Sequence, residues 1–223
     1  MPATYDEPAR RYRDAEMGAD IVLHLVGPPV GLVAASTLLA LAIAAGGSRI
    51  VGSVAVYGVG LVAMLGFSAA YHLKRFPARH EVLRRLDHAA IFVMIAGTYT
   101  PFTLCLMKGS LALWSTAAMW AMALMGVTVK LAFPRRFELA SIAIYLALGW
   151  SFVIFMPALL DVLDRPTIFL ILAGGVAYSI GACIHRWRRL PFHDAIWHGL
   201  VLAGAGLHYA AILHGVVLAG ARP

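Results

Sequence analysis

Apolar residues fall into seven long runs along the chain, and short polar segments separate them. The runs cover residues 21–45, 50–73, 88–107, 111–131, 139–160, 167–185 and 195–218. A helix that crosses a bilayer needs about 20 predominantly apolar residues, and all seven runs are close to that length or longer. The segments between them carry charges, glycines and prolines, which end helices. The pattern therefore predicts an all-α membrane protein, a bundle of seven transmembrane helices.

Composition excludes the alternative of a soluble helical protein. Apolar residues make up 61% of the 223 residues and charged residues only 13%, whereas soluble domains carry about 25% charged residues. The mean hydropathy of +0.80 leaves too little polar surface to cover a water-soluble core. We expect residues 1–15 to form a flexible cytoplasmic tail and residues 16–223 to form one transmembrane domain.

The lysines and arginines indicate how the bundle is oriented. Cytoplasmic loops of membrane proteins are enriched in Lys and Arg. When the eighteen basic residues are assigned to alternate sides, fourteen fall on the side of the N-terminus and four on the other side. The four are Arg49, Lys108, Arg165 and Arg222. The split predicts a cytoplasmic N-terminus and an external C-terminus. It accounts for the net charge of +7 without nucleic acid, and it predicts contact with anionic lipid head groups.

Ionisable side chains lie at the cytoplasmic ends of several predicted helices. Ser68 and His72 end the second run, four residues apart and therefore on one helix face. Asp87 opens the third run, and Asp194 and His198 open the seventh with the same spacing. Ionisable residues inside a membrane are costly and usually functional. Each one alone also has a simpler explanation, because Asp caps helix N-termini and His favours helix C-termini.

The first run brings further groups to the same level. Glu16, Asp20 and His24 precede or open it, and Asp20 and His24 share a helix face; Asp20 alone would be explained as an N-cap. His208 lies ten residues beyond His198, which is about 15 Å along a helix. The two cannot share one metal ion, and His208 is predicted to form a hydrogen bond near the middle of the membrane.

Taken together, these residues point to a cavity or a metal site. The first, second, third and seventh helices all bring Asp or His to the cytoplasmic side, whereas the outer loops contain only Asp161 and Asp164 and no histidine. Histidine and carboxylate ligands suit zinc, and three protein ligands plus a water molecule are typical of a reactive zinc site. Asp194 and His198 have the spacing of two ligands to one ion.

Three motifs at these positions resemble those of a known family. The first is S-x3-H, which ends at His72. The second is Asp87 followed by G-T-Y-T-P, which ends at Pro101, and the third is A-I-W-H, which ends at His198 and is followed by His208. They resemble the haemolysin III family of bacterial membrane proteins, which belongs with the progestin and adipoQ receptors. The resemblance covers all seven runs and implies a seven-helix zinc protein of the bacterial inner membrane with its N-terminus inside.

The resemblance also implies the zinc ligands. In the family, zinc is held by the His of S-x3-H and by both histidines of an H-x3-H motif in the last helix. His72 and His198 match two of these positions, and Asp194 stands at the third, where it can also ligate zinc. The neighbouring His193 is the alternative, but it lies about 140° around the helix from His198, which favours Asp194. The predicted zinc ligands are therefore His72, Asp194 and His198.

A further family motif, E-x2-N-x3-H, is only partly present in the first helix. His24 matches it, Asp20 stands in place of the Asn, and Glu16 is one residue too far upstream. His24 or His193 could also close the fourth position of the zinc site, and a closed site would indicate a structural metal.

Two functions fit these residues. The first, implied by resemblance to ceramidase-like relatives, is a zinc-dependent intramembrane hydrolase of lipid amides. In it Asp87 would hold or deprotonate the attacking water, and Ser68 would donate a hydrogen bond to the developing oxyanion. The second is a non-enzymatic sensor or membrane-homeostasis protein that binds a lipid and uses zinc structurally. A pore-forming haemolysin fits less well, because charged residues do not continue to the outer side.

Overall fold

The computed structural model describes residues 7–73, 76–133 and 138–220, with side chains omitted for residues 7–13, 77 and 138. All its regular elements are helical: α1 (Glu7–Ala45), α2 (Ser48–His72), the short η1 (Pro77–Arg79), α3 (His80–Leu106), α4 (Gly109–Ala132), α5 (Glu138–Trp150), α6 (Phe152–Leu159), α7 (Arg165–Arg186), α8 (His193–Ile212) and the π-helix η2 (Leu213–Leu218). Within this part of the chain no strand occurs.

Seven segments of these helices are long and apolar enough to cross a membrane, which confirms the predicted bundle. α5 and α6 together form the fifth segment, and α8 continues into η2 to form the seventh. α1 begins at Glu7, inside the segment expected to be a tail, while residues 1–6 lie outside the described residues. The predicted helix boundaries are otherwise close to those of the structure, apart from α3, which begins eight residues earlier than expected.

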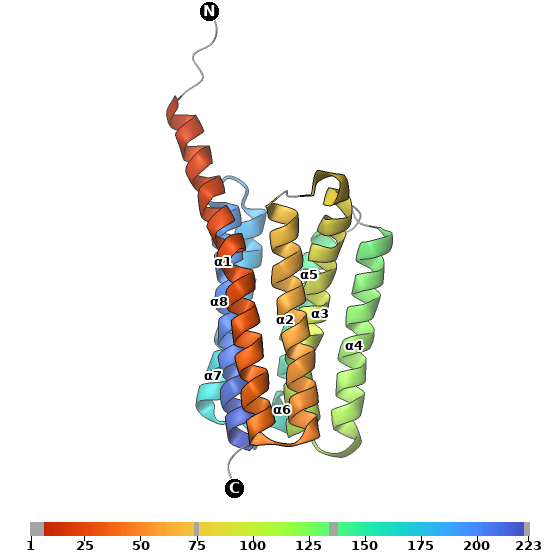
Figure 1. Ribbon diagram of the computed structural model, residues 1–223. Coiled ribbons are helices and arrows are strands. Elements are labelled where there is room, and N and C mark those ends of the chain that lie inside the picture. Colours follow the sequence, from red (N-terminus) through yellow and green to blue (C-terminus); the bar gives the residue numbers. More distant parts are fainter. Residues whose placement is uncertain (1–6, 74–75, 134–137, 221–223) are drawn as a thin grey trace, which may run out of the picture.

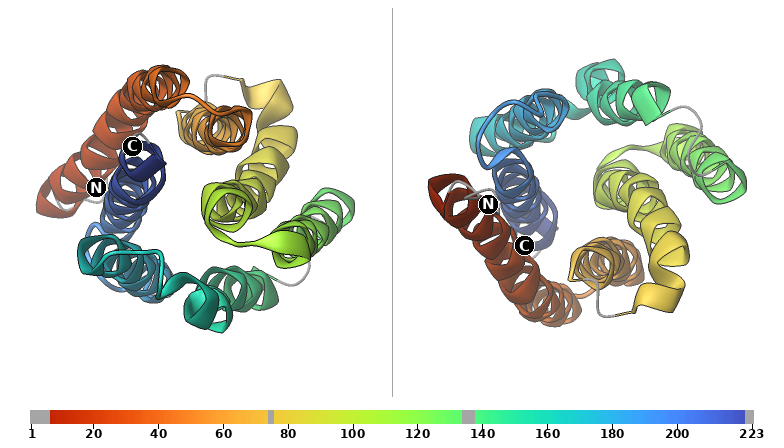
Figure 2. Two further views of the ribbon diagram at one scale, coloured as in Figure 1. Left: turned by 90° about the horizontal axis from the view of Figure 1, so that it is seen from below. Right: turned by 90° about the horizontal axis from the view of Figure 1, so that it is seen from above.

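The helices run up and down along one common axis, and consecutive helices lie side by side (Figure 1). Seen along that axis, they surround a central region (Figure 2). α3 is the most enclosed of the seven segments, with 67% of its apolar window buried. We call the end at which α1 begins, and at which α2 and α7 finish, the N-terminal end of the bundle.

The fifth segment is interrupted at Ser151, where the sequence predicted one continuous helix. The hydroxyl of Tyr99, in α3, lies 2.6 Å from the carbonyl oxygen of Gly149 and 3.1 Å from that of Leu148. The Ser151 hydroxyl donates in turn to the Tyr99 oxygen, at 3.1 Å. An interrupted helix is tolerated in a membrane where side chains bond the freed backbone groups. The tyrosine of the G-T-Y-T-P motif therefore stabilises the break.

Close packing of α7 against α8 is centred on His208. Its Nε2–H donates to the carbonyl oxygen of Ile171, at 3.1 Å, so the predicted mid-membrane hydrogen bond is present. A Cβ at Gly174 would lie 2.5 Å from the His208 ring. Because real Cβ atoms do not approach so closely, glycine is required at this point of α7.

Candidate metal centre

Three histidines from three different helices meet near the N-terminal end of the bundle. His24 comes from α1, His72 from α2 and His198 from α8. Their ring centroids are separated by 4.5 Å (His24–His72), 4.4 Å (His24–His198) and 4.5 Å (His72–His198). His24 is 6% exposed, and the side chain of His198 is 11% exposed. Three imidazole rings from separate helices are thus held in contact in one largely shielded place.

Asp20 holds two of these rings in place. Its carboxylate accepts a hydrogen bond from Nδ1 of His198, at 2.6 Å. Its backbone carbonyl accepts one from Nδ1 of His24, one turn further along α1, at 2.8 Å. With these tautomers both rings direct Nε2 away from Asp20. The same carboxylate lies 3.8 Å from Nδ1 of His72, which is too far for a hydrogen bond.

These four residues form a group that can hold a metal ion. The candidate ligand atoms of Asp20, His24, His72 and His198 all lie within 4.8 Å of one another. Imidazole nitrogens with a carboxylate are a donor set that zinc prefers. Histidines that bind metals usually donate their second ring N–H to a carboxylate or a backbone carbonyl, as His198 and His24 do here. The residues therefore fit a zinc ion.

Ser68 and Asp87, the two residues predicted to take part in catalysis, lie beside this group. Oδ2 of Asp87 is 3.9 Å from Nε2 of His72, and the Ser68 hydroxyl is 3.3 Å from Nε2 of His24. Ser68 also lies within hydrogen-bonding reach of the Asp87 carboxyl group. Asp87 is buried, although it was also explained as a simple helix cap. Four of the five predicted site residues therefore converge: Ser68, His72, Asp87 and His198.

Asp194, the fifth, has a different environment. Its side chain is about half exposed, and its Oδ1 lies 3.6 Å from Nδ1 of His193 and 3.8 Å from Nδ1 of His185. Phe192, directly before this first turn of α8, has a left-handed backbone with φ 58°. The turn thus points Asp194 towards the end of α7, one helical turn above His198. Its role as a zinc ligand stays a prediction.

From the sequence alone, Asp20 and His24 are predicted to have only a secondary role. The signal that could have found them is their i,i+4 spacing, identical to that of Asp194 and His198. The spacing shows which residues share a face of α1. It does not show that this face is turned towards α2 and α8.

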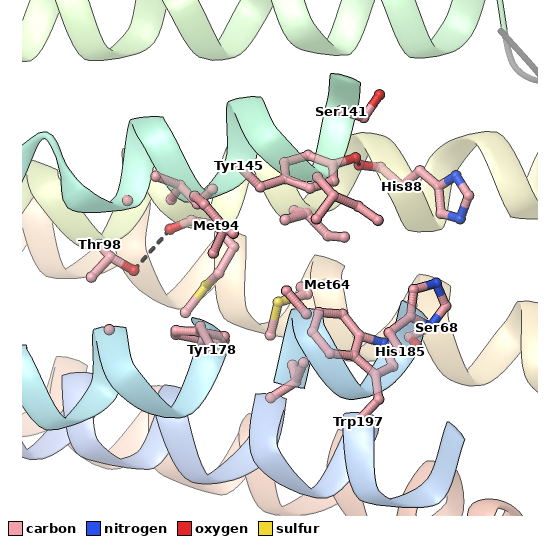
Figure 3. A pocket seen from close by; sticks show the side chains of 18 of the residues that line it. Met64, Ser68, His88, Met94, Thr98, Ser141, Tyr145, Tyr178, His185 and Trp197 are labelled. Carbon is pink, nitrogen blue, oxygen red and sulfur yellow. Dashed lines mark hydrogen bonds between the residues drawn. The ribbon is translucent and has the colours of Figure 1, made fainter. Parts of the chain in front are cut away.

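A cavity of about 400 Å³ extends from this group into the bundle. Its lining includes Ser68, His72, Asp87 and His198 near the N-terminal end, and mainly apolar side chains further in. Figure 3 shows Met64, Met94 and Tyr178 along the deeper wall, with Ser68 and Trp197 towards the other end. Small-molecule sites have volumes of about 300–1,000 Å³ and mostly apolar walls with few polar groups. The cavity has the size and polarity of a ligand site that reaches the candidate metal centre.

Comparison with known proteins agrees with these features. The family model described as haemolysin-III related matches residues 16–209. Hemolysin-3 of Bacillus cereus is 36% identical over 191 residues, covering 86% of this chain and 87% of that protein. The hemolysin-3 homolog of Bacillus subtilis is 34% identical over 187 residues, covering 84% and 88%. The human monocyte to macrophage differentiation factor, a member of the progestin and adipoQ receptors, is 29% identical over 166 residues, covering 70% and 67%. The chain therefore belongs to the haemolysin III family and is a multi-pass membrane protein of the bacterial type.

Proposed function

We propose that the protein is a zinc-dependent intramembrane hydrolase of acyl lipids, with His24, His72 and His198 as the zinc ligands. The choice of zinc ligands follows from the orientation of the rings. Nδ1 of His198 and Nδ1 of His24 both donate to oxygens of Asp20, at 2.6 and 2.8 Å. Each ring therefore keeps Nε2 for a metal, and Asp20 fixes the ring instead of occupying a coordination position.

Three histidine ligands leave one position open for chemistry. A zinc ion held by these three histidines would polarise the carbonyl group of a substrate and lower the pKa of a bound water molecule towards about 7. Asp87 is the carboxylate beside His72 that would accept the proton of the attacking water. It would then give this proton to the amine or alcohol that leaves when the C–N or C–O bond of the substrate breaks. Ser68 is the hydroxyl donor that would stabilise the oxyanion formed from the carbonyl. Both side chains line the cavity, so a substrate in it would meet them.

The observation that carries the proposal is the continuity of this group with the apolar cavity. A lipid whose acyl chain occupied the apolar part would bring its amide or ester carbonyl to the level of Ser68, Asp87 and His72. A lipid amide is the substrate that resemblance to the family's relatives favours. If the N-terminal end is cytoplasmic, as the distribution of Lys and Arg predicts, the reaction takes place in the inner leaflet.

A structural metal in a lipid-binding sensor is the second candidate, and one observation favours it. The carboxylate of Asp20 belongs to the same compact group as the three imidazoles. If it ligated the ion, four protein groups would close the site and tie α1, α2 and α8 together. The two functions therefore differ in the role of Asp20, as a ligand or as the group that orients His198.

Turnover by the purified, zinc-loaded protein tests the proposal. We expect proteoliposomes containing a fluorescent N-acyl lipid to release fatty acid, and Asp87→Asn to reduce the rate by about 10²–10⁴-fold, the usual contribution of a general base. Asp161→Asn, at the opposite end of the bundle, is the matched control and should keep the rate. The variant must retain zinc for the comparison to count. A zinc-loaded wild type that hydrolyses neither lipid amides nor esters would leave the sensor as the better account.

A further inference from the structure

Basic side chains outnumber acidic ones in the lining of the cavity. Four basic side chains line the cavity, against the carboxyl groups of Asp87 and Asp194. The four are Arg84 of α3, Lys130 of α4, Arg186 of α7 and Arg188 of the loop that follows α7. All four lie near the N-terminal end of the bundle, as His72 and Asp87 do.

The general enrichment of basic residues at one face of a membrane protein does not explain all four. That rule concerns loops in water, but Lys130 is only 2% exposed and the Arg84 side chain only 12%. Arg84 binds Glu81 of its own helix, at 3.0 Å, and so is partly neutralised. Burying charge at a membrane protein's interior is costly and usually marks a ligand path. Both side chains line the cavity and have interaction partners within the protein, so neither is free to bind a ligand.

Arg186 and Arg188 are the cations available to a ligand. Both are exposed, and within the described residues neither makes a salt bridge or a hydrogen bond. Guanidinium groups bind phosphate through paired, parallel hydrogen bonds, which ammonium groups cannot do. Two such arginines in the lining of the cavity therefore favour a phosphate group as the polar end of the ligand.

The length of the cavity indicates what is attached to this phosphate. Along α3 the lining extends from Arg84 to Phe102, which is about 27 Å of helix. The apolar part, from Ile91 to Phe102, is about 16 Å long by the same rise. Half of a bilayer's hydrocarbon core is about 15 Å thick. The apolar part therefore matches one acyl chain of a single leaflet, and inorganic phosphate alone would leave it unfilled.

We propose that the cavity selects acyl lipids whose head group carries a phosphate with net negative charge, and that Arg186 and Arg188 bind this phosphate. The inference rests on the proposed function in one respect, that the acyl chain lies in the cavity beside the metal group. It adds the class of head group. In this arrangement the phosphate, the carbonyl linkage and the chain meet the arginines, the metal group and the apolar wall in that order.

Binding by the full-length protein in a neutral detergent tests the proposal. The probes are lysophosphatidylglycerol, a monoacylglycerol with the same chain, which lacks the phosphate, and inorganic phosphate. We expect the wild type to bind the anionic lipid at least tenfold more tightly than the monoacylglycerol. The double variant Arg186→Gln/Arg188→Gln should lose this preference but bind the monoacylglycerol as the wild type does. Binding of the neutral lipid shows that the variant is folded. Arg49→Gln/Arg165→Gln, at the other end of the bundle, should keep the preference.

Three outcomes would overturn the proposal. The first is equal affinity of the wild type for the two lipids, and the second is an undiminished preference for the anionic lipid in Arg186→Gln/Arg188→Gln. The third is displacement of the anionic lipid by inorganic phosphate at the lipid's own concentration, which would identify a free-phosphate site. Failure of the proposed hydrolase is seen separately. If the wild type lacks turnover or zinc but prefers the anionic lipid, and Arg186→Gln/Arg188→Gln loses that preference, the head-group inference holds and the hydrolase proposal fails.

Discussion

Replacing Asp20 by asparagine distinguishes the two roles of this residue. In the structure its carboxylate accepts the Nδ1–H of His198 at 2.6 Å, a short, charge-assisted hydrogen bond. Asparagine keeps an acceptor oxygen of nearly the same shape but removes the negative charge. The His198 ring then loses the charged partner that fixes its tautomer and orientation, while all three imidazoles remain.

The size of the effect follows from that geometry. Loss of such an outer partner typically weakens metal binding by about 10–100-fold, which corresponds to about 1.4–2.7 kcal/mol. We therefore expect the Asp20→Asn variant to bind one zinc ion per chain with an affinity reduced by this factor. Competition with a fluorescent zinc chelator in detergent solution measures it. Asp194→Asn is the matched control, because that side chain is about half exposed and lies outside the group, and it should bind zinc as the wild type does.

Two results would refute this reasoning. An Asp20→Asn variant with wild-type affinity would show that the hydrogen bond does not orient a ligand. Complete loss of zinc from the same variant would show that Asp20 is itself a ligand and would favour the closed, structural site. Weaker zinc binding in Asp194→Asn would instead restore the ligand set predicted from the sequence.

Two further predictions concern the fold. Tyr99→Phe should lower the free energy of unfolding by about 1–3 kcal/mol, since the carbonyl groups of Leu148 and Gly149 lose a buried hydroxyl partner. Thermal unfolding in detergent measures this effect, with Tyr209→Phe as the control because the Tyr209 hydroxyl makes no hydrogen bond within the described residues. Equal unfolding midpoints for the two variants would contradict the prediction. Alkaline phosphatase fused after the last residue should be active in bacterial cells, because the distribution of Lys and Arg predicts an external C-terminus; an inactive fusion, with activity restored when the enzyme is fused after α4, would reverse the orientation.

The seven membrane segments could be predicted from the sequence because each depends on a local property, the length of an apolar run. The break at Ser151 could not. It lies within a continuous apolar run, and its carbonyl groups are bonded by Tyr99, a residue of α3 that is about 50 positions away. Local pattern alone gives no indication of such a partner.

The candidate site shows the same division. His72, His198, Ser68 and Asp87 were predicted from motifs and from their common depth in the membrane, and the structure brings them together. Asp194 was predicted from i,i+4 spacing with His198, which places two residues on one helix face but leaves open where the first turn of α8 points. Phe192 and the loop before it decide that direction. His24 shares its depth with the group, but only the packing of α1 beside α2 and α8 shows that it belongs there.

The zinc content of purified protein tests the central claim most directly. We predict about one zinc ion per chain in the wild type, measured by mass spectrometry of the metal after removal of loosely bound ions, and none in His72→Ala/His198→Ala. The variant His208→Ala, altered ten residues further along α8, should keep its zinc. A double variant that retained the zinc of the wild type, or a wild type that bound none when zinc was supplied, would contradict a metal centre formed by these histidines.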